Sequence, residues 1–148
     1  MIRKLSLLFI TFFFLSACQF PADPDKTLEK IEMIKKMKVG WCGGPFDELV
    51  LKEKDLINAL SQTLDATVTW ESDLQEVLFE KLEENKLQVV VCRIKENSPW
   101  KDKLAFTTPF FIHKKEKFVL ALPPGENAWL KYVNEFIVQF KEKNDQYF

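Results

Sequence analysis

Side chains that could bind a small polar molecule gather in two short stretches of this sequence. The first, residues 43–46, offers the backbone amides of two glycines and one flat aromatic face; its candidate ligand-binding residues are Gly44 and Phe46. The second, residues 93–101, offers two cations, a hydroxyl and an indole, namely Arg93, Ser98, Trp100 and Lys101. A cation and a hydroxyl would bind the carboxylate of a zwitterion, and an aromatic wall would cover its side chain. The expected ligand is therefore an amino acid or a similar small polar solute.

Each of these groups also has an ordinary structural interpretation. Trp100 can cap the core of the domain, because tryptophan is commonly buried apart from its polar edge. Arg93 and Lys101 can be solvated surface charges, which is the commoner case for such residues. No nucleophile with a neighbouring base is visible in the sequence, so we do not expect an enzyme.

Cysteine and histidine are too scarce for a metal site. The chain has three cysteines and one histidine, and His113 lies on a lysine-rich turn where it should be solvated. A structural zinc site needs four ligands, so no metal or other cofactor is expected.

The spacing of apolar residues predicts the elements that would position these groups. Short apolar runs predict strands at residues 38–42, 67–70 and 87–94, and the last is a continuous run of the kind buried on both faces of a sheet. Helical spacing predicts helices over residues 27–37, 46–64, 72–84 and 127–143. The third of these helices should open on a capping box, because Ser72 precedes Gln75 by three residues, and should stop at Asn85. The order predicts an α/β domain of three layers with a mostly parallel sheet and the first strand central.

The ligand-binding stretches and the two inner cysteines fall together in this arrangement. Ligands of open α/β sheets bind beyond the carboxyl ends of the strands, where residues 43–46 and 93–101 would lie. Cys42 and Cys92 end neighbouring strands, so their Cα atoms should be within about 7 Å, the limit for a disulfide. Adjacent parallel strands are a strained setting for such a bond, so we expect thiols or a labile disulfide; both cysteines can also be small core residues.

Residues 110–122 interrupt the alternation of strands and helices. Two apolar runs flank a short charged turn there, which predicts a β-hairpin at or beside the edge of the sheet. Parallel strands return through a helix, so a tight hairpin is unexpected at this point of an α/β chain.

The N-terminus resembles the export signal of a bacterial lipoprotein. Arg3 and Lys4 precede an apolar run from Leu5 to Leu15 that is too short for a membrane span, and Leu15 opens the sequence LSAC, which ends at Cys18. The pattern predicts a signal peptide at 1–17, a lipidated tether at 18–26 with the lipid on Cys18, and a domain at 27–148. It also predicts anchorage in the bacterial cell envelope, facing the periplasm or exterior. The alternative is an ordinary cleaved signal with a chance cysteine.

Composition supports one globular domain and argues against nucleic-acid binding. The chain is 47% hydrophobic and 29% charged, with a formal net charge of −1. The mature length supports one core, and no basic patch or arginine-rich run is present that would bind nucleic acid.

Several segments in order resemble the bacterial extracellular solute-binding proteins of family three. The segments are MKVGW, GPF, EKDLI, LFEKLEENKLQVVV, SPWKDKLAFTTPFF and LALPPGENAWLKYVNEFI, and the resemblance covers residues from about 37 to 140. The resemblance implies the type II periplasmic binding fold of the amino-acid receptors of ABC importers. In that family the chain leaves the first lobe after the TPF segment and builds a second lobe before it returns. Here the second lobe is absent, and the hairpin would join the two hinge strands directly.

The same resemblance bears on individual site residues. It implies that Ser98 supplies the hydroxyl that binds the α-carboxylate, and that Glu53 is the acidic residue at the start of the first helix. Lys101 stands near the place of the usual arginine, and it offers a point charge where arginine offers a fork. Gln88 stands where relatives usually have Asp.

Two functions follow from this interpretation. The first is weak binding of an amino acid or small polar solute in association with ABC-type transport, with an envelope or transporter protein as a further partner. The second is a degenerate envelope lipoprotein that uses its single lobe for protein–protein interaction without solute binding. A single open lobe offers half of the usual contacts, so a small ligand should bind in the millimolar range, about −4 kcal/mol.

Overall fold

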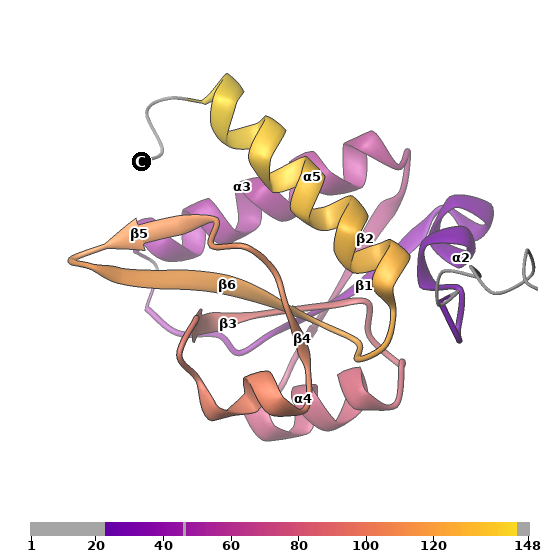
Figure 1. The fold of residues 1–148 in the computed structure, drawn as a ribbon, viewed down its shortest axis with the longest axis horizontal. Helices are drawn as coiled ribbons and strands as arrows, with labels where there is room; N and C mark the ends of the chain where they lie inside the picture. Colours follow the sequence, from indigo (N-terminus) through magenta and orange to yellow (C-terminus); the bar gives the residue numbers. More distant parts are fainter. Residues whose placement is uncertain (1–22, 46, 145–148) are drawn as a thin grey trace, which may run out of the picture.

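The computed structural model describes residues 23–45 and 47–144, which form one six-stranded mixed sheet with helices on both faces (Figure 1). The strands are β1 (Lys36–Trp41), β2 (Thr67–Ser72), β3 (Val89–Lys95), β4 (Ala105–Phe106), β5 (Phe111–His113) and β6 (Glu116–Leu122). Their order is β2-β1-β3-β6-β4, and β5 also pairs with β6. β1 pairs in parallel with both β2 and β3, which confirms the predicted parallel arrangement with the first strand between the other two.

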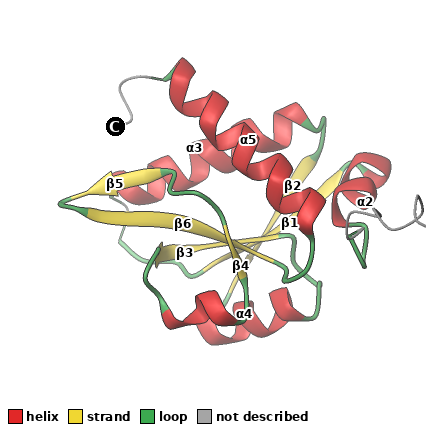
Figure 2. Ribbon diagram, viewed as in Figure 1, coloured by secondary structure: helices red, strands yellow, loops and turns green. Residues whose placement is uncertain are grey.

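The helices cover the sheet in the predicted three layers (Figure 2). They are α2 (Thr27–Ile34), α3 (Glu48–Thr63), α4 (Gln75–Glu83) and α5 (Asn127–Lys143), with a 3-10 turn η2 at Pro99–Asp102. The helices α3 and α5 lie on one face and α4 lies on the other. Two hydrophobic clusters result, one on each side of the sheet, because the valines of β3 are buried on both faces.

Helix α5 shows why sequence spacing specifies this packing. Trp129, Val133 and Ile137 recur every four residues and are fully buried against the sheet. The indole nitrogen of Trp129 donates to the carbonyl oxygen of Gln88 at 2.9 Å, so the ring is buried with its polar edge satisfied.

The hairpin forms as predicted and lies beside the edge of the sheet. Phe111 of β5 pairs with Phe118 of β6, and the turn residues Lys114 and Lys115 have φ angles of 49° and 70°. Two successive residues with positive φ match the right-handed twist of the flanking strands. β6 itself runs antiparallel to β3, and β4 and β5 follow one another along its other side.

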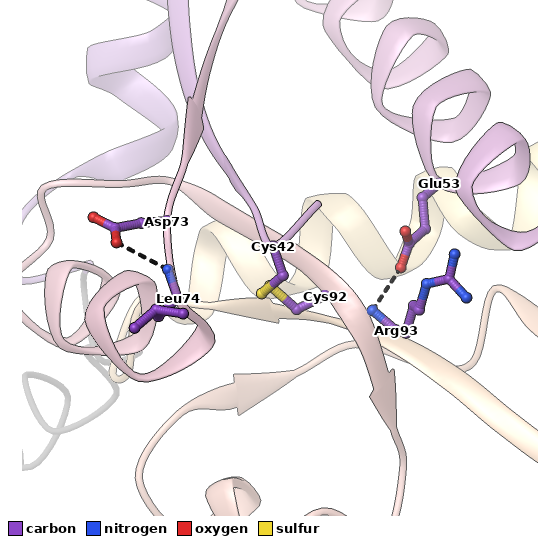
Figure 3. Close-up of a disulfide and its surroundings, with 6 residues drawn as sticks. All are labelled: Cys42, Glu53, Asp73, Leu74, Cys92 and Arg93. Carbon is purple, nitrogen blue, oxygen red and sulfur yellow. Dashed lines mark hydrogen bonds between the residues drawn. A yellow bond between two sulfur atoms is a disulfide. The ribbon is translucent and has the colours of Figure 1, made fainter. Parts of the chain in front are cut away.

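The start of α4 differs from the prediction. Ser72 is the last residue of β2 and does not cap a helix. The helix begins at Gln75 after Leu74, which makes no side-chain cap, and the carboxylate of Asp73 accepts from the backbone amide of Leu74 (Figure 3). The strand extends further than predicted because the backbone of Glu71 and Ser72 still pairs with β1. At the other end the prediction is confirmed, since Asn85 follows the helix with a φ of 56°.

Residues 23–26, which the sequence assigns to the tether, are bound to the domain. The backbone amides of Asp25 and Thr27 each donate at 2.8 Å to the carboxylate of Glu126, and the amide of Ala128 donates at 2.6 Å to Asp23. Glu126 is 1% exposed. The N-terminal end of the described chain is thereby fixed beside the start of α5.

The predicted signal peptide and Cys18 lie outside the described residues. None of the helices within residues 23–45 and 47–144 is long and apolar enough to span a bilayer.

Candidate functional site

Cys42, the residue after β1, and Cys92, in the middle of β3, form a disulfide (Figure 3). Their Cα atoms are 5.1 Å apart, so the predicted proximity is confirmed. The free thiols that we also considered are not found, and the lability of the bond stays a prediction. Cys92 belongs to the cluster on the α4 side of the sheet, and Cys42 packs against it.

Directly after the disulfide, Arg93 turns out of the regular strand ladder. Its φ is 53°, and the register between β3 and β6 shifts between Val90 and Ile94. A bulge of this kind leaves one residue unpaired in the ladder. The backbone amide of Arg93 instead donates at 2.8 Å to the carboxylate of Glu53 in α3. Glu53 therefore ties α3 to the bulge in β3.

Glu53 is a buried carboxyl group with an incomplete set of partners. It is 1% exposed, and burial raises its pKa to about 7, against the lowering effects of the Arg93 amide and the Arg93 charge. Its Oε2 atom and the Nε atom of Arg93 are both buried and have no hydrogen-bond partner among the described residues. Buried polar atoms without partners are uncommon, and a bound water, an ion or a functional role can account for them.

The guanidinium of Arg93 in β3 is hydrogen-bonded to the loop that follows β1. One nitrogen donates at 2.7 Å to the carboxylate of Asp47, and another donates at 2.8 Å to the carbonyl oxygen of Pro45. The hydrogen bond that the Asp47 carboxylate accepts from Arg93 lowers the pKa of Asp47. Asp47 also caps α3, because its carboxylate accepts from the amide of Val50 at 3.1 Å. Gly44 lies over the guanidinium, and a Cβ atom there would be 3.6 Å from its Nε.

A cavity of about 290 Å³ opens beside this ion pair. Its walls come from the start of α3, from β3 and from the hairpin, and they are Asp47, Glu48, Leu49, Arg93, Phe111, His113 and Phe118. The cavity thus combines an aromatic wall with both signs of charge. Such a lining can receive a small zwitterion, with Arg93 near its carboxylate and an acidic side chain near its amine.

The other predicted residues lie on the opposite side of the sheet. The hydroxyl of Ser98 accepts from the backbone amide of Trp100 at 3.4 Å and caps the 3-10 turn. The indole of Trp100 packs edge-on against Phe79 of α4 with ring centroids 5.0 Å apart, and Lys101 is exposed. A separate hollow of about 190 Å³ is lined by Pro99, Trp100 and Lys103.

The structure therefore divides the predicted site into two groups. Gly44, Glu53 and Arg93 come together on the α3 side, whereas Ser98, Trp100 and Lys101 surround the η2 turn on the α4 side. Phe46 lies outside the described residues. No group of three or more histidine, cysteine, aspartate or glutamate side chains that could hold a metal occurs in the part of the chain that the structure describes.

Asp47 and the hairpin residues of the cavity were missed by sequence reasoning. Asp47 could have been found, since an aspartate just before a helical pattern is a typical N-cap. The side chains of Phe111 and Phe118 gave no such signal, because their approach to α3 depends on how the hairpin crosses the sheet.

Comparison with known proteins finds likeness in structure only. No family model matches the sequence, and no curated protein matches it. A point mutant of the arginine-bound form of domain 1 from TmArgBP superimposes with a TM-score of 0.69 at 19% identity, covering 78% of this chain and 98% of that one. The ancestral cationic amino acid solute-binding protein AncCDT-1 gives 0.70 at 13% identity, covering 81% and 96%. An arginine-bound amino acid ABC transporter substrate-binding protein from Streptococcus pneumoniae gives 0.68 at 11% identity, covering 82% and 95%.

The fold is that of one lobe of a type II periplasmic binding protein. Its structural neighbours are amino-acid-binding solute-binding proteins, as the sequence resemblance implied. Within this fold, the Gly43–Pro45 loop and Arg93 lie beyond the carboxyl end of β1, where ligands of open α/β sheets bind.

Proposed function

We propose that this protein binds an amino acid or a similar small polar solute at the carboxyl edge of its single lobe, in association with ABC-type transport. The observation that carries the proposal is the likeness to domain 1 from TmArgBP in its arginine-bound form. That protein supports the idea that one lobe is sufficient to hold an amino acid. The hairpin β5–β6 would then stand where relatives insert their second lobe. We propose binding alone, without catalysis.

The cavity beside Arg93 is the proposed seat of the solute. It offers a guanidinium, two acidic side chains and an aromatic wall within about 290 Å³. The site is open on one side, so binding in the millimolar range, about −4 kcal/mol, is expected.

Tryptophan fluorescence can test both the binding and its location. Trp41 packs with the cluster on the α3 side, and Trp100 packs with the cluster on the α4 side. Arginine, alanine and glutamate are titrated against Trp41→Phe and Trp100→Phe variants. Trp70 and Trp129 emit in both variants, so the difference between the two titrations reports which face responds. Binding at the cavity should give a saturable response in the Trp100→Phe variant, and Arg93→Ala should abolish it.

The matched control is Ser98→Ala combined with Lys101→Ala. This pair should leave the response intact if the cavity is the seat, and should abolish it if the solute binds beside the η2 turn. The absence of a saturable response to any of the three amino acids would refute solute binding.

We further propose that the protein is lipid-anchored in the bacterial cell envelope through Cys18. The LSAC sequence behind a short apolar run supports this. Metabolic labelling with a fatty-acid probe should mark the wild-type protein and leave Cys18→Ala unmarked. Label that survives in the variant would refute the anchor.

A second candidate function is the binding of a protein partner without any solute. This function is favoured because the guanidinium of Arg93 already donates hydrogen bonds to Asp47 and Pro45, so it is less available to the carboxylate of a solute. The hairpin also exposes Ile112, which is 48% accessible. A pull-down from envelope extracts, run with and without an amino-acid mixture, separates the two functions, because only a solute receptor should bind its partner differently when the mixture is present.

A further inference from the structure

Helix α2 carries an exposed stripe of one lysine and two apolar residues. The residues are Lys30, Met33 and Ile34, of which the last two follow Lys30 by three and four positions and so are its neighbours on the helix surface; they are called the α2 stripe below. Lys26 is the N-cap of the helix and forms an ion pair with Glu29. Met33 is 77% exposed and Ile34 is 55% exposed, although both are large apolar side chains. The adjoining side of the helix is buried through Thr27 and Ile31. The stripe is therefore turned away from the core of the domain.

The charge around the stripe differs in sign from that of the rest of the protein. Residues 26–38 hold five lysines and two glutamates, a net charge of +3, whereas the whole chain has a net charge of −1 and the remainder therefore −4. Within residues 23–45 and 47–144, Lys30 and Lys36 form no ion pair. Lys30 on the stripe and Lys36 at the start of β1 are thus available to an anionic partner.

The path of the chain brings this end of the domain close to the proposed anchor. Five residue steps lead from Cys18 to Asp23, a reach of at most about 18 Å even when fully extended. From Asp23 onward the chain is fixed, because Asp23 and Thr27 are hydrogen-bonded to Ala128 and Glu126. A lipid on Cys18 would therefore hold the α2 end of the domain within a short distance of the bilayer.

We propose that the α2 stripe rests on the surface of an anionic phospholipid bilayer, with Met33 and Ile34 among the headgroups and Lys30 beside the phosphates. The proposal depends on the lipid anchor at Cys18 but not on solute binding. Basic amphipathic helices bind such surfaces through buried apolar area together with electrostatic attraction. The stripe would add a second contact with the bilayer beside the lipid on Cys18.

This contact would set the orientation of the whole domain. β1 begins at Lys36, directly after α2, and runs toward the carboxyl edge where Cys42 lies (Figure 1). The hairpin β5–β6 projects at the end of the molecule opposite α2. A bilayer beneath the α2 stripe would leave the hairpin, which lines the cavity at Arg93, at the other end of the domain.

The test uses the lipidated full-length product, purified from membranes and reconstituted into vesicles. Mass spectrometry first establishes the lipid on Cys18, and a protein without it refutes the anchor and this proposal together. An environment-sensitive fluorophore is attached to the Met33→Cys variant and, as a matched control, to Leu74→Cys. Leu74 is 70% exposed at the start of α4, so both variants change an exposed apolar residue.

Vesicles of phosphatidylcholine with phosphatidylglycerol should shift the emission of the label at position 33 to the blue, and the label at 74 should not respond. Lys30→Gln should lower the ratio of bound to unbound helix about fivefold, whereas Lys114→Gln on the hairpin should not change it. An unchanged emission at position 33, an equal response at 74, or an equal shift on pure phosphatidylcholine would each overturn the proposal. Because no amino acid is added, these results are independent of solute binding.

Discussion

The carboxylate of Glu53 accepts a 2.8 Å hydrogen bond from the backbone amide of Arg93, and this bond ties α3 to the bulge at the end of β3. The bulge places the guanidinium of Arg93 toward Asp47 and the cavity, where a regular strand would place a different side chain. The geometry of the candidate site thus depends on one buried carboxyl group.

The first prediction concerns stability against pH. The pKa of Glu53 is raised from 4.5 to about 7 in the folded protein, so between these values the folded state binds more protons than the unfolded state. Its contribution to the free energy of unfolding therefore falls as pH rises from about 4.5 to 7, by up to about 3 kcal/mol. Glu53→Gln should remove this dependence and unfold at a higher denaturant concentration than wild type at pH 8.

Urea unfolding at pH 5 and pH 8 measures the effect. Glu48→Gln serves as the control, since Glu48 is an exposed glutamate of the same helix, and its pH dependence should match that of wild type. If Glu53→Gln kept the wild-type pH dependence, a group other than Glu53 would be responsible.

The second prediction concerns the disulfide. It closes a loop with a sequence separation of 50, and the chain-entropy estimate for a loop of this length is about 4 kcal/mol. Cys42 is only partly buried, so a mild reductant should open the bond in the folded protein and lower the free energy of unfolding by this order. Thiol counting on denatured, unreduced protein should give none at Cys42 and Cys92, and two after mild reduction. A bond that resists mild reductant would contradict the expected lability.

The arrangement of strands and helices could be predicted from sequence because each element carries its own periodic signal. The valines of β3 and the four-residue spacing of Trp129, Val133 and Ile137 specify which sides are buried. The hairpin could be predicted because a charged turn joins two apolar runs.

The division of the site could not be predicted, because it depends on which face of the sheet each loop follows. Arg93 and Ser98 are five positions apart in sequence, and the sequence gives no sign that a bulge sends one toward α3 while the next loop crosses to α4. The capping box at Ser72 failed for a related reason. Pairing of β2 with β1 continued through Ser72 and overrode its local preference for a helix start.

The third prediction concerns the N-terminal junction. Glu126 is buried and accepts hydrogen bonds from the amides of Asp25 and Thr27. Glu126→Ala should leave both amides without their acceptor and lower the free energy of unfolding by about 1–3 kcal/mol. It should also open the segment around Asp23 to limited proteolysis, which mass spectrometry of the fragments detects. Glu135→Ala, an exposed glutamate of α5, is the control and should change neither quantity. Equal protease resistance of Glu126→Ala and wild type would mean that other contacts hold the segment.

The last prediction concerns the competition between Asp47 and a solute for Arg93. In the structure the guanidinium is bonded to the carboxylate of Asp47, so a solute carboxylate must share or displace that partner. Asp47→Asn keeps an oxygen that can cap Val50 but removes the charge. Because partly exposed ion pairs are weak, the affinity for alanine should rise only modestly, by about twofold to fivefold. Titration followed by tryptophan emission measures the change, and Glu135→Gln, at an exposed glutamate of α5 that does not line the cavity, should leave the affinity unchanged. A fall in affinity in Asp47→Asn would instead identify Asp47 as a ligand for the amino group, and an absent response in both variants and in wild type would favour the protein-partner function.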